Sequence, residues 1–250
     1  MHLFEVVSYL NGLLEIPAFR DYPNAMNGLQ MENSGSLSRI GAAVDACEVT
    51  IRDAVQAGVD LLLVHHGLFW GGLSPVAGAS YRKTRLLIEG DMAIYSAHLP
   101  LDAHPVFGNN VLLSEALGLT GGTPFFPAVG EPIGLRFETE ISREVLRSLL
   151  EKAVGGPVHL APGGPVLARK VGVVSGGAGA EVARAAAEGI DTLVTGEGPH
   201  WSFCSAEELG INLFYAGHYA TETFGVKALA AHLSERFALP WQFIDHPTGL

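Results

Sequence analysis

Two adjacent histidines, His65 and His66, are the strongest chemical signal in the sequence. They follow the apolar run at residues 61–64, which is typical of a buried parallel strand. Because neighbouring side chains of a strand point to opposite faces, the pair could serve two different metal ions where the chain leaves the strand. The alternative is a pair of buried, hydrogen-bonded histidines, but two imidazoles at one strand end favour metal binding.

A second pattern, a histidine followed four residues later by an acid, occurs twice: as His98 with Asp102, and as His218 with Glu222. Neutral imidazole and carboxylate together are ligands for Zn, Fe, Mn or Co, and not for the all-oxygen shell of calcium. A carboxylate can bridge two ions, so we expect Glu222 or Asp102 to join two metals about 3.5–4 Å apart, as in two-metal hydrolytic sites. Either acid taken alone would be interpreted as a helix cap or a solvated charge.

Two histidines are candidates for proton transfer. His98 fits a metal ligand, a group that orients a ligand, or a general acid or base. His200, in the loop Gly198-Pro199-His200-Trp201, is the other candidate for an acid or base, and the sequence does not choose between the two. The glycine-rich loop at residues 175–179 could cradle a phosphate, but a tight strand-to-helix turn is the favoured interpretation. The sequence has no Gly-x-Ser-x-Gly elbow and no Cys beside a His motif, which argues against covalent serine or cysteine catalysis.

The composition describes an acidic globular protein. Its 250 residues are 48% apolar, enough to bury a large core, and its net charge of −11 argues against general nucleic-acid binding. Only 16% of the residues are charged, which favours a homo-oligomer with buried faces. Two cysteines cannot build a disulfide framework, and no apolar stretch approaches the length of a membrane span. With no targeting signal at the start, we expect a cytoplasmic protein without membrane association.

The elements that position these residues alternate as strand, helix and strand, which predicts an α/β protein with mixed or parallel sheets flanked by helices. Strands are expected at residues 39–45, 60–64, 92–96 and 241–244, and helices at residues 3–14, 48–57, 81–89 and 224–237.

The second half of the chain repeats the first 131 positions later, as Asp60 aligns with Asp191 and Gly58 with Gly189. Two similar α/β halves are therefore expected, with the metal site between them at the carboxyl ends of their strands. We place the first domain at residues 1–125 plus 224–250 and the second at residues 126–223, joined by a turn-rich link.

Several motifs together resemble those of the NGG-interacting factor 3-like family, known in bacteria as GTP cyclohydrolase 1 type 2 homologues. They are Asn27-Gly28-Leu29-Gln30, Val64-His65-His66-Gly67-Leu68-Phe69-Trp70, Ala97-His98-Leu99-Pro100-Leu101-Asp102, Thr195-Gly196-Glu197 and Ala216-Gly217-His218-Tyr219-Ala220-Thr221-Glu222. The resemblance runs nearly end to end and matches the short form, without the domain that longer members insert mid-chain. Gly67 departs from the family, which usually has a proline after the histidine pair; the change loosens the loop but removes no ligand.

The resemblance implies a dinuclear metal site and a toroidal homohexamer whose sites face an internal cavity. It implies two divalent ions per chain, with Zn, Fe, Mn and Co as the candidates. The family's ligand pattern maps onto positions that the residues themselves had singled out: His65, His66, Asp102, His218 and Glu222.

The implied activity is that of a metal-dependent hydrolase resembling a type 2 GTP cyclohydrolase. A metal-activated water would attack a purine nucleotide or a similar small substrate, with His98 or His200 as the acid or base. Two alternatives use the same ligands. A non-catalytic metal-binding assembly or regulatory protein needs no acid or base, and a metal-dependent phosphoesterase differs only in its substrate. Separate substitution of His98 and His200 distinguishes the hydrolase from the non-catalytic metal-binding protein, because an enzyme would lose turnover while a carrier would not.

Overall fold

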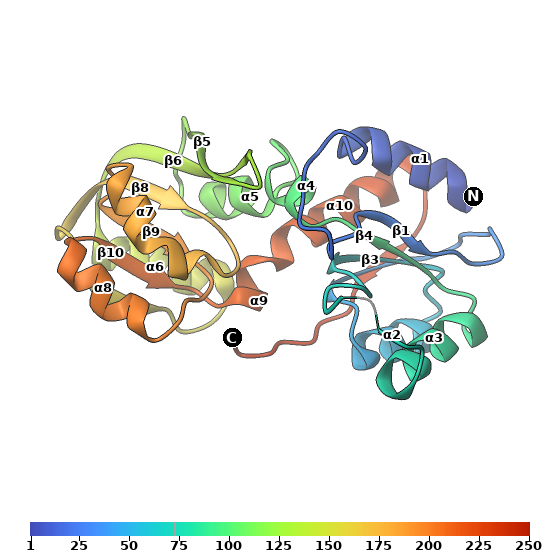
Figure 1. The fold of residues 1–250 in the computed structure, drawn as a ribbon. Helices are drawn as coiled ribbons and strands as arrows, with labels where there is room; N and C mark the ends of the chain where they lie inside the picture. The colour runs from blue at the N-terminus through green and yellow to red at the C-terminus, as the bar shows by residue number, and fades with distance from the viewer. Residues whose placement is uncertain (73) are drawn as a thin grey trace. The chain divides into compact units, whose positions relative to one another are not determined.

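The computed structural model describes residues 1–72 and 74–250, which form two compact units (Figure 1). Unit 1 comprises Met1–Leu101 and Gly225–His246, and unit 2 comprises Asp102–Phe224 and Pro247–Leu250. Each unit has its own sheet and its own helices, so the protein is α/β, as the sequence predicts.

Unit 1 is built on a five-stranded sheet in the order β1-β4-β3-β2-β11. Its strands are β1 (Gly28–Met31), β2 (Ile40–Asp45), β3 (Leu61–His66), β4 (Ala93–Ser96) and β11 (Trp241–Phe243). All neighbouring strands are parallel except β1 and β4. The central strands are buried almost throughout, which is typical of parallel strands covered on both faces.

Helices cover both faces of this sheet (Figure 1). They are α1 (Leu3–Leu13), α2 (Glu48–Gln56), α3 (Gly78–Glu89) and α10 (Thr223–Phe237), the last of which begins in unit 2. On one face, Ile51 of α2 and Leu87 of α3 pack into one cluster with Leu62 of β3. On the other face, the Tyr95 hydroxyl of β4 donates to Asn11 of α1. The side chains of β3 therefore alternate between two helix layers.

Unit 2 is built on a six-stranded sheet in the order β5-β6-β8-β9-β10-β7. Its strands are β5 (Thr123–Ala128), β6 (Glu131–Ser142), β7 (His159–Pro162), β8 (Leu167–Val173), β9 (Thr192–Thr195) and β10 (Asn212–Tyr215). The inner strands β8, β9 and β10 are parallel, and the outer pairs are antiparallel. The remaining helices are α4 (Leu99–Asp102), α5 (Asn109–Ala116), α6 (Arg143–Val154), the 3-10 turn η1 (Ala178–Glu181), α7 (Val182–Ala187), α8 (Trp201–Leu209) and α9 (His218–Thr221). Within the described part of the chain, no helix combines the length and apolarity needed to cross a membrane.

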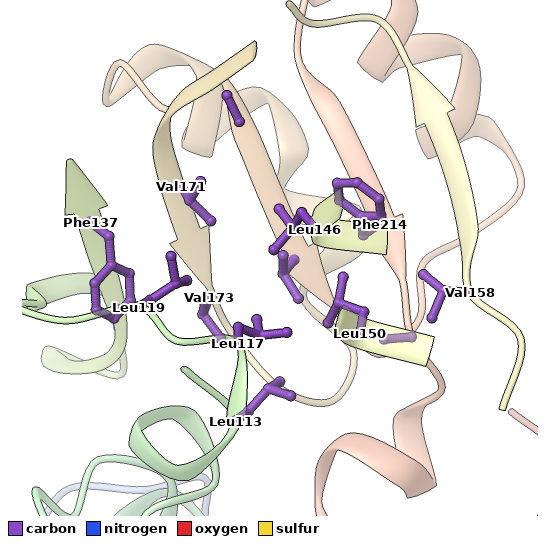
Figure 2. Close-up of a cluster of buried hydrophobic side chains, with 13 residues drawn as sticks. Leu113, Leu117, Leu119, Phe137, Leu146, Leu150, Val158, Val171, Val173 and Phe214 are labelled. Carbon is purple, nitrogen blue, oxygen red and sulfur yellow. The ribbon is translucent and has the colours of Figure 1, made fainter. Parts of the chain in front are cut away.

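The main core of unit 2 lies between its sheet and the helices α5 and α6 (Figure 2). Leu146 and Leu150 of α6 recur at helical spacing and pack with Val171 of β8 and Phe214 of β10. A Ser142 hydroxyl that accepts a hydrogen bond from the Val145 N–H caps the start of α6. The local sequence thus sets both the start of this helix and the face that it buries.

The strand registers support the internal repeat. In unit 1, Ile40 of β2 pairs with Leu61 of β3. In unit 2, Val171 of β8 pairs with Thr192 of β9, which is the same pairing 131 positions later. The two halves therefore share a frame of parallel strands as well as a sequence pattern.

The repeated aspartate has one structural role in both units. The Asp60 carboxylate accepts hydrogen bonds from the backbone N–H groups of Ser38 and Arg39, just before β2. The Asp191 carboxylate accepts hydrogen bonds from backbone N–H groups at the corresponding place in β8, those of Arg169 and Lys170. Each aspartate thus ties the start of its own strand to the neighbouring strand, just before the first paired residues of the two strands.

The second half of the chain has one more residue than the first half between its third parallel strand and the histidine that follows it. The Ala97 N–H donates to the Val64 carbonyl, and the Ala216 N–H donates to the Thr195 carbonyl. These bonds align Ala97 with Ala216, whereas the sequence motif alone aligns Ala97 with Gly217. Gly217 is therefore an extra residue between β10 and His218 in the second half.

Most predicted elements occur within a few residues of their expected positions, and two differences concern the site. β3 does not end before the histidine pair but continues through it, because His66 pairs with Asp45 on β2. Residues 102–125 belong to unit 2, whereas the sequence assigned them to the first domain, because α5 packs against β6 and β8 of unit 2. The antiparallel strands β5 and β6 have no counterpart in the repeat. β7 lies 131 positions after β1 and pairs antiparallel with β10, as β1 does with β4. None of these four strands was predicted.

We predict that Asp60→Ala and Asp191→Ala each lower the free energy of unfolding by about 1–2 kcal/mol, since each leaves backbone donors without their acceptor. Urea unfolding followed by circular dichroism measures this. Asp53→Ala, at an exposed position on α2, is the control and should change stability by less than about 0.5 kcal/mol. Equal stabilities for all three variants would contradict the shared role of the two aspartates.

Candidate metal centre

Three histidines of unit 1 meet at the ends of β3 and β4. His65 and His66 are the last two residues of β3, and His98 follows shortly after β4. Each offers one ring nitrogen, and the three nitrogens lie within 4.8 Å of one another. The ring of Trp70 lies beside them, with its centroid 4.4 Å from that of His98. The structure therefore groups His98, a candidate for proton transfer from sequence, with the predicted ligand pair.

Hydrogen bonds from Nδ1 orient the rings of the pair. His65 Nδ1–H donates to the carbonyl oxygen of Ala97 at 3.0 Å, and His66 Nδ1–H donates to Asp45 Oδ1 at 2.9 Å. A carbonyl or a carboxylate can only accept, so the proton of each neutral ring lies on Nδ1. Nε2 then carries the lone pair, and a histidine oriented in this way through its other nitrogen is typical of metal sites.

His98 is oriented in the same way by Asp21. His98 Nδ1–H donates to Asp21 Oδ1 at 2.9 Å, and the same carboxylate accepts from the Leu99 N–H and from the Asn27 amide. Burial raises the pKa of Asp21, but hydrogen bonds from His98 and Asn27 outweigh it, and the net effect lowers the pKa below its usual value. Asp21 is therefore a carboxylate whose charge is available to stabilise a cation held at His98.

A histidine and two carboxylates form a second group, which lies wholly within unit 2. His218 Nε2 lies 3.1 Å from Glu222 Oε1, and His218 Nδ1–H donates to Glu197 Oε1 at 2.9 Å. Burial would lower the pKa of His218, but the hydrogen bonds and negative charges of Glu222 and Glu197 raise it from 6.5 to about 9. A metal ion that reached Nε2 would therefore replace a proton.

Asp102 and Glu222 contact the same loop of unit 2. Asp102 Oδ1 accepts hydrogen bonds from Asn109 at 2.8 Å and from the Ser175 hydroxyl at 3.2 Å. The next residue, Gly176, has a φ of +67°, and a Cβ atom there would meet Glu222 Oε1. Only glycine adopts this conformation readily and leaves room for the carboxylate. The loop is a strand-to-helix turn, as favoured from sequence, and it contacts both candidate bridging acids.

The structure also locates His200 and Gly67, two residues that the sequence analysis singled out. Among the described residues, His200 is in neither ligand group; it is exposed at the N-terminal end of α8 and lines a cavity together with Glu197. Gly67 leaves room for Gln30, whose side-chain oxygen accepts from the Leu68 N–H at 2.6 Å. A larger residue at position 67 would displace that amide, which is a physical reason for glycine there.

Sequence reasoning missed the acceptors that orient the rings. Asp45 could have been found, because it ends the strand that pairs with β3 beside His66. Glu197 could also have been found, since it occupies the position of His66 in the repeat. Asp21 gives no local signal, because 77 residues separate it from His98.

The fold and the two ligand groups define an α/β protein with a candidate metal centre. The family model of Duf34/NIF3 (NGG1p interacting factor 3) matches residues 1–248, and the chain belongs to this family. This confirms the resemblance stated from the sequence motifs.

Relatives cover the chain from end to end. A protein of Deinococcus radiodurans is 42% identical over 98% of this chain and 94% of its own, and one of Halobacterium salinarum is 43% identical over the whole of both chains. Both carry the name GTP cyclohydrolase 1 type 2 homolog. A crystal structure of a Thermus thermophilus protein has a TM-score of 0.91 and 44% identity over 100% of both chains.

We predict that Gly176→Ala weakens metal binding by about tenfold or more, because the added methyl group displaces Glu222. The positive φ should also cost about 1–2 kcal/mol of stability. Gly210→Ala is the matched control, since Gly210 has a φ of +70° with nothing within 4 Å of an added Cβ. Zinc titration and thermal unfolding of both variants test this. If the two variants lose stability equally and both bind zinc like the parent, Gly176 does not position the carboxylate.

Proposed function

We propose that the protein is a dinuclear metal-dependent hydrolase of a small substrate. In this proposal two divalent ions are held by His65, His66, Asp102, His218 and Glu222. The proposal extends to a homohexamer, which is supported by the family resemblance and by the low fraction of charged residues.

The observation that carries the proposal is shared by the three proposed histidine ligands and by His98. His65, His66, His98 and His218 each direct Nδ1 to a carbonyl or carboxylate oxygen. Structural histidines have no need of this uniform arrangement, whereas metal ligands do, because it fixes each ring and leaves Nε2 as the atom that can bind an ion. The carboxylates of Asp102 and Glu222 complete a nitrogen and oxygen donor set that fits Zn, Fe, Mn or Co.

When bound, the two ions would polarise the substrate and lower the pKa of a water molecule to near neutrality. The protein's own residues would then orient the substrate and move protons. The pair of His98 and Asp21 is suited to proton transfer, because the carboxylate stabilises the charged imidazole in a buried place. The names of the relatives suggest a purine nucleotide such as GTP as the substrate; hydrolysis of a phosphoester by the same centre is the alternative within this class.

A metal carrier or regulatory protein is the second candidate. The observation that favours it is the position of His98 within the imidazole cluster, where it can act as a further ligand instead of as an acid or base. In that case the other candidate named from the sequence for proton transfer is His200, which lies outside both ligand groups.

Glu222→Gln tests the metal centre. If Glu222 bridges two ions, its loss leaves their mutual repulsion poorly compensated in a site of low dielectric, and at least one ion should be lost while the fold survives. Glu235→Gln, at an exposed position on α10, is the control. Elemental analysis after reconstitution with Zn, Mn, Fe or Co measures the stoichiometry. If Glu222→Gln retains two ions with the parental affinity, the bridge is Asp102 or a water, and if even the parent retains only trace metal, the dinuclear proposal is wrong.

His98→Gln and His200→Gln, made separately, distinguish the enzyme from the carrier. The probes are GTP and p-nitrophenyl phosphate, supplied with each of the four metals. For an enzyme that uses His98 as acid or base, we expect turnover to fall by about 100-fold or more with both ions retained. Loss of an ion from His98→Gln instead identifies His98 as a ligand. A parent protein that holds two ions and hydrolyses neither probe supports the carrier.

A further inference from the structure

Unit 2 contains a cavity of about 830 Å³ next to its ligand group. The walls come from the end of α6, the loop before α8, the helices α8 and α9, and the chain segment at residues 247–250. The Tyr219 N–H donates to the carbonyl oxygen of Leu250 at 3.1 Å, which holds that segment against α9. The volume falls within the range of small-molecule sites, which is about 300–1,000 Å³.

Aromatic rings and prolines make up most of the apolar wall. Phe203, Tyr215 and Tyr219 line the cavity together with Pro157, Pro199 and Pro247. The Tyr215 hydroxyl is hydrogen-bonded to the Ser202 hydroxyl at 2.7 Å, which holds its ring in place. Phe203 is 38% exposed although it is a large apolar side chain. Such walls favour a flat aromatic ligand, which can stack against several rings at once.

The charge of the cavity selects among such ligands. Glu197 lines it and is 43% exposed, and none of the described lining residues is Lys or Arg. His159 and His200 are the other ionisable side chains of the wall besides the two tyrosines. Phosphate groups are normally held by Arg or Lys and are repelled by a carboxylate. The N-terminus of α8 also lines the cavity, but its partial positive charge is smaller than the full negative charge of Glu197. A nucleoside triphosphate is therefore a poor occupant, whereas a cation is attracted by both Glu197 and the faces of the rings.

We propose that this cavity binds a small aromatic molecule that carries a positive charge directed at Glu197. The bound cation would contact the Glu197 carboxylate, which also accepts the hydrogen bond from His218 Nδ1. Glu197 would then lie between the cation and His218, a candidate metal ligand. This binding goes beyond the proposed hydrolase, because it depends on the walls of unit 2 and not on metal ions or on a reaction.

Calorimetric titration with three probes that share one ring tests the charge preference. They are 2-naphthylmethylamine as the cation, 2-naphthylmethanol as the neutral form and 2-naphthylacetate as the anion, with GTP as a fourth probe. In protein stripped of metal by a chelator, we expect the cation to bind about tenfold tighter than the anion, and GTP to show no binding. An anion or GTP that binds as tightly as the cation would overturn the proposal.

Matched variants locate the site. Phe203→Ala should weaken the cation and the neutral probe by about tenfold each, while Leu209→Ala, also exposed on α8 but not lining the cavity, should change neither. Glu197→Gln should remove the advantage of the cation over the neutral probe, and Glu207→Gln should keep it. If Phe203→Ala or Glu197→Gln leaves the three affinities unchanged, the probes bind elsewhere and the proposal is wrong.

Metal stoichiometry, measured on a second portion of the same preparation after reconstitution with metal, separates this proposal from the proposed function. If the preparation takes up two ions but its stripped portion does not bind the probes, the cavity proposal alone is rejected. If the stripped portion binds the probes but the preparation takes up no ion, the metal centre alone is rejected.

Discussion

The candidate centre depends on one interaction, the hydrogen bond from histidine Nδ1 to an oxygen acceptor. An imidazole on its own can rotate and can carry its proton on either nitrogen, so neither its direction nor its donor atom is defined. In this protein the acceptors are one backbone carbonyl, at Ala97, and carboxylates at Asp21, Asp45 and Glu197. Each acceptor lies on another segment of the same unit, so the direction of every ring follows from how that unit packs.

The sheets explain why these acceptors are in place. Parallel strands end at one edge, so the residues that follow β2, β3 and β4 meet there, and the same holds for β8, β9 and β10 in unit 2. At the opposite end, Asp60 and Asp191 tie the starts of neighbouring strands together. The register of each sheet is therefore secured at one end, and the candidate ligands lie at the other.

The two halves share this frame but have diverged in what it carries. Where unit 1 has His65 and His66 at the end of β3, unit 2 has Gly196 and Glu197, and an extra residue, Gly217, precedes His218. One half thus presents a cluster of imidazoles, and the other presents one imidazole between two carboxylates. In unit 2, α9 and the loop before α8 also line the apolar cavity, so the same segments serve both the ligand group and the cavity wall.

The sequence by itself determined the α/β class, the repeat, the family and the candidate ligands, because strand patterns and the spacing of a histidine and an acid are local properties. The sequence did not indicate that residues 102–125 group with unit 2, because the packing of α5 on β6 and β8 joins segments far apart in the chain. Asp21 could not be found from the sequence either, because it is 77 residues from the ring that it orients. The cavity was missed for the same reason, since its walls come from separate segments of the chain. Only tertiary structure decided these features, since a hydrogen bond or a cavity wall requires proximity in space, and spacing along the chain does not encode it.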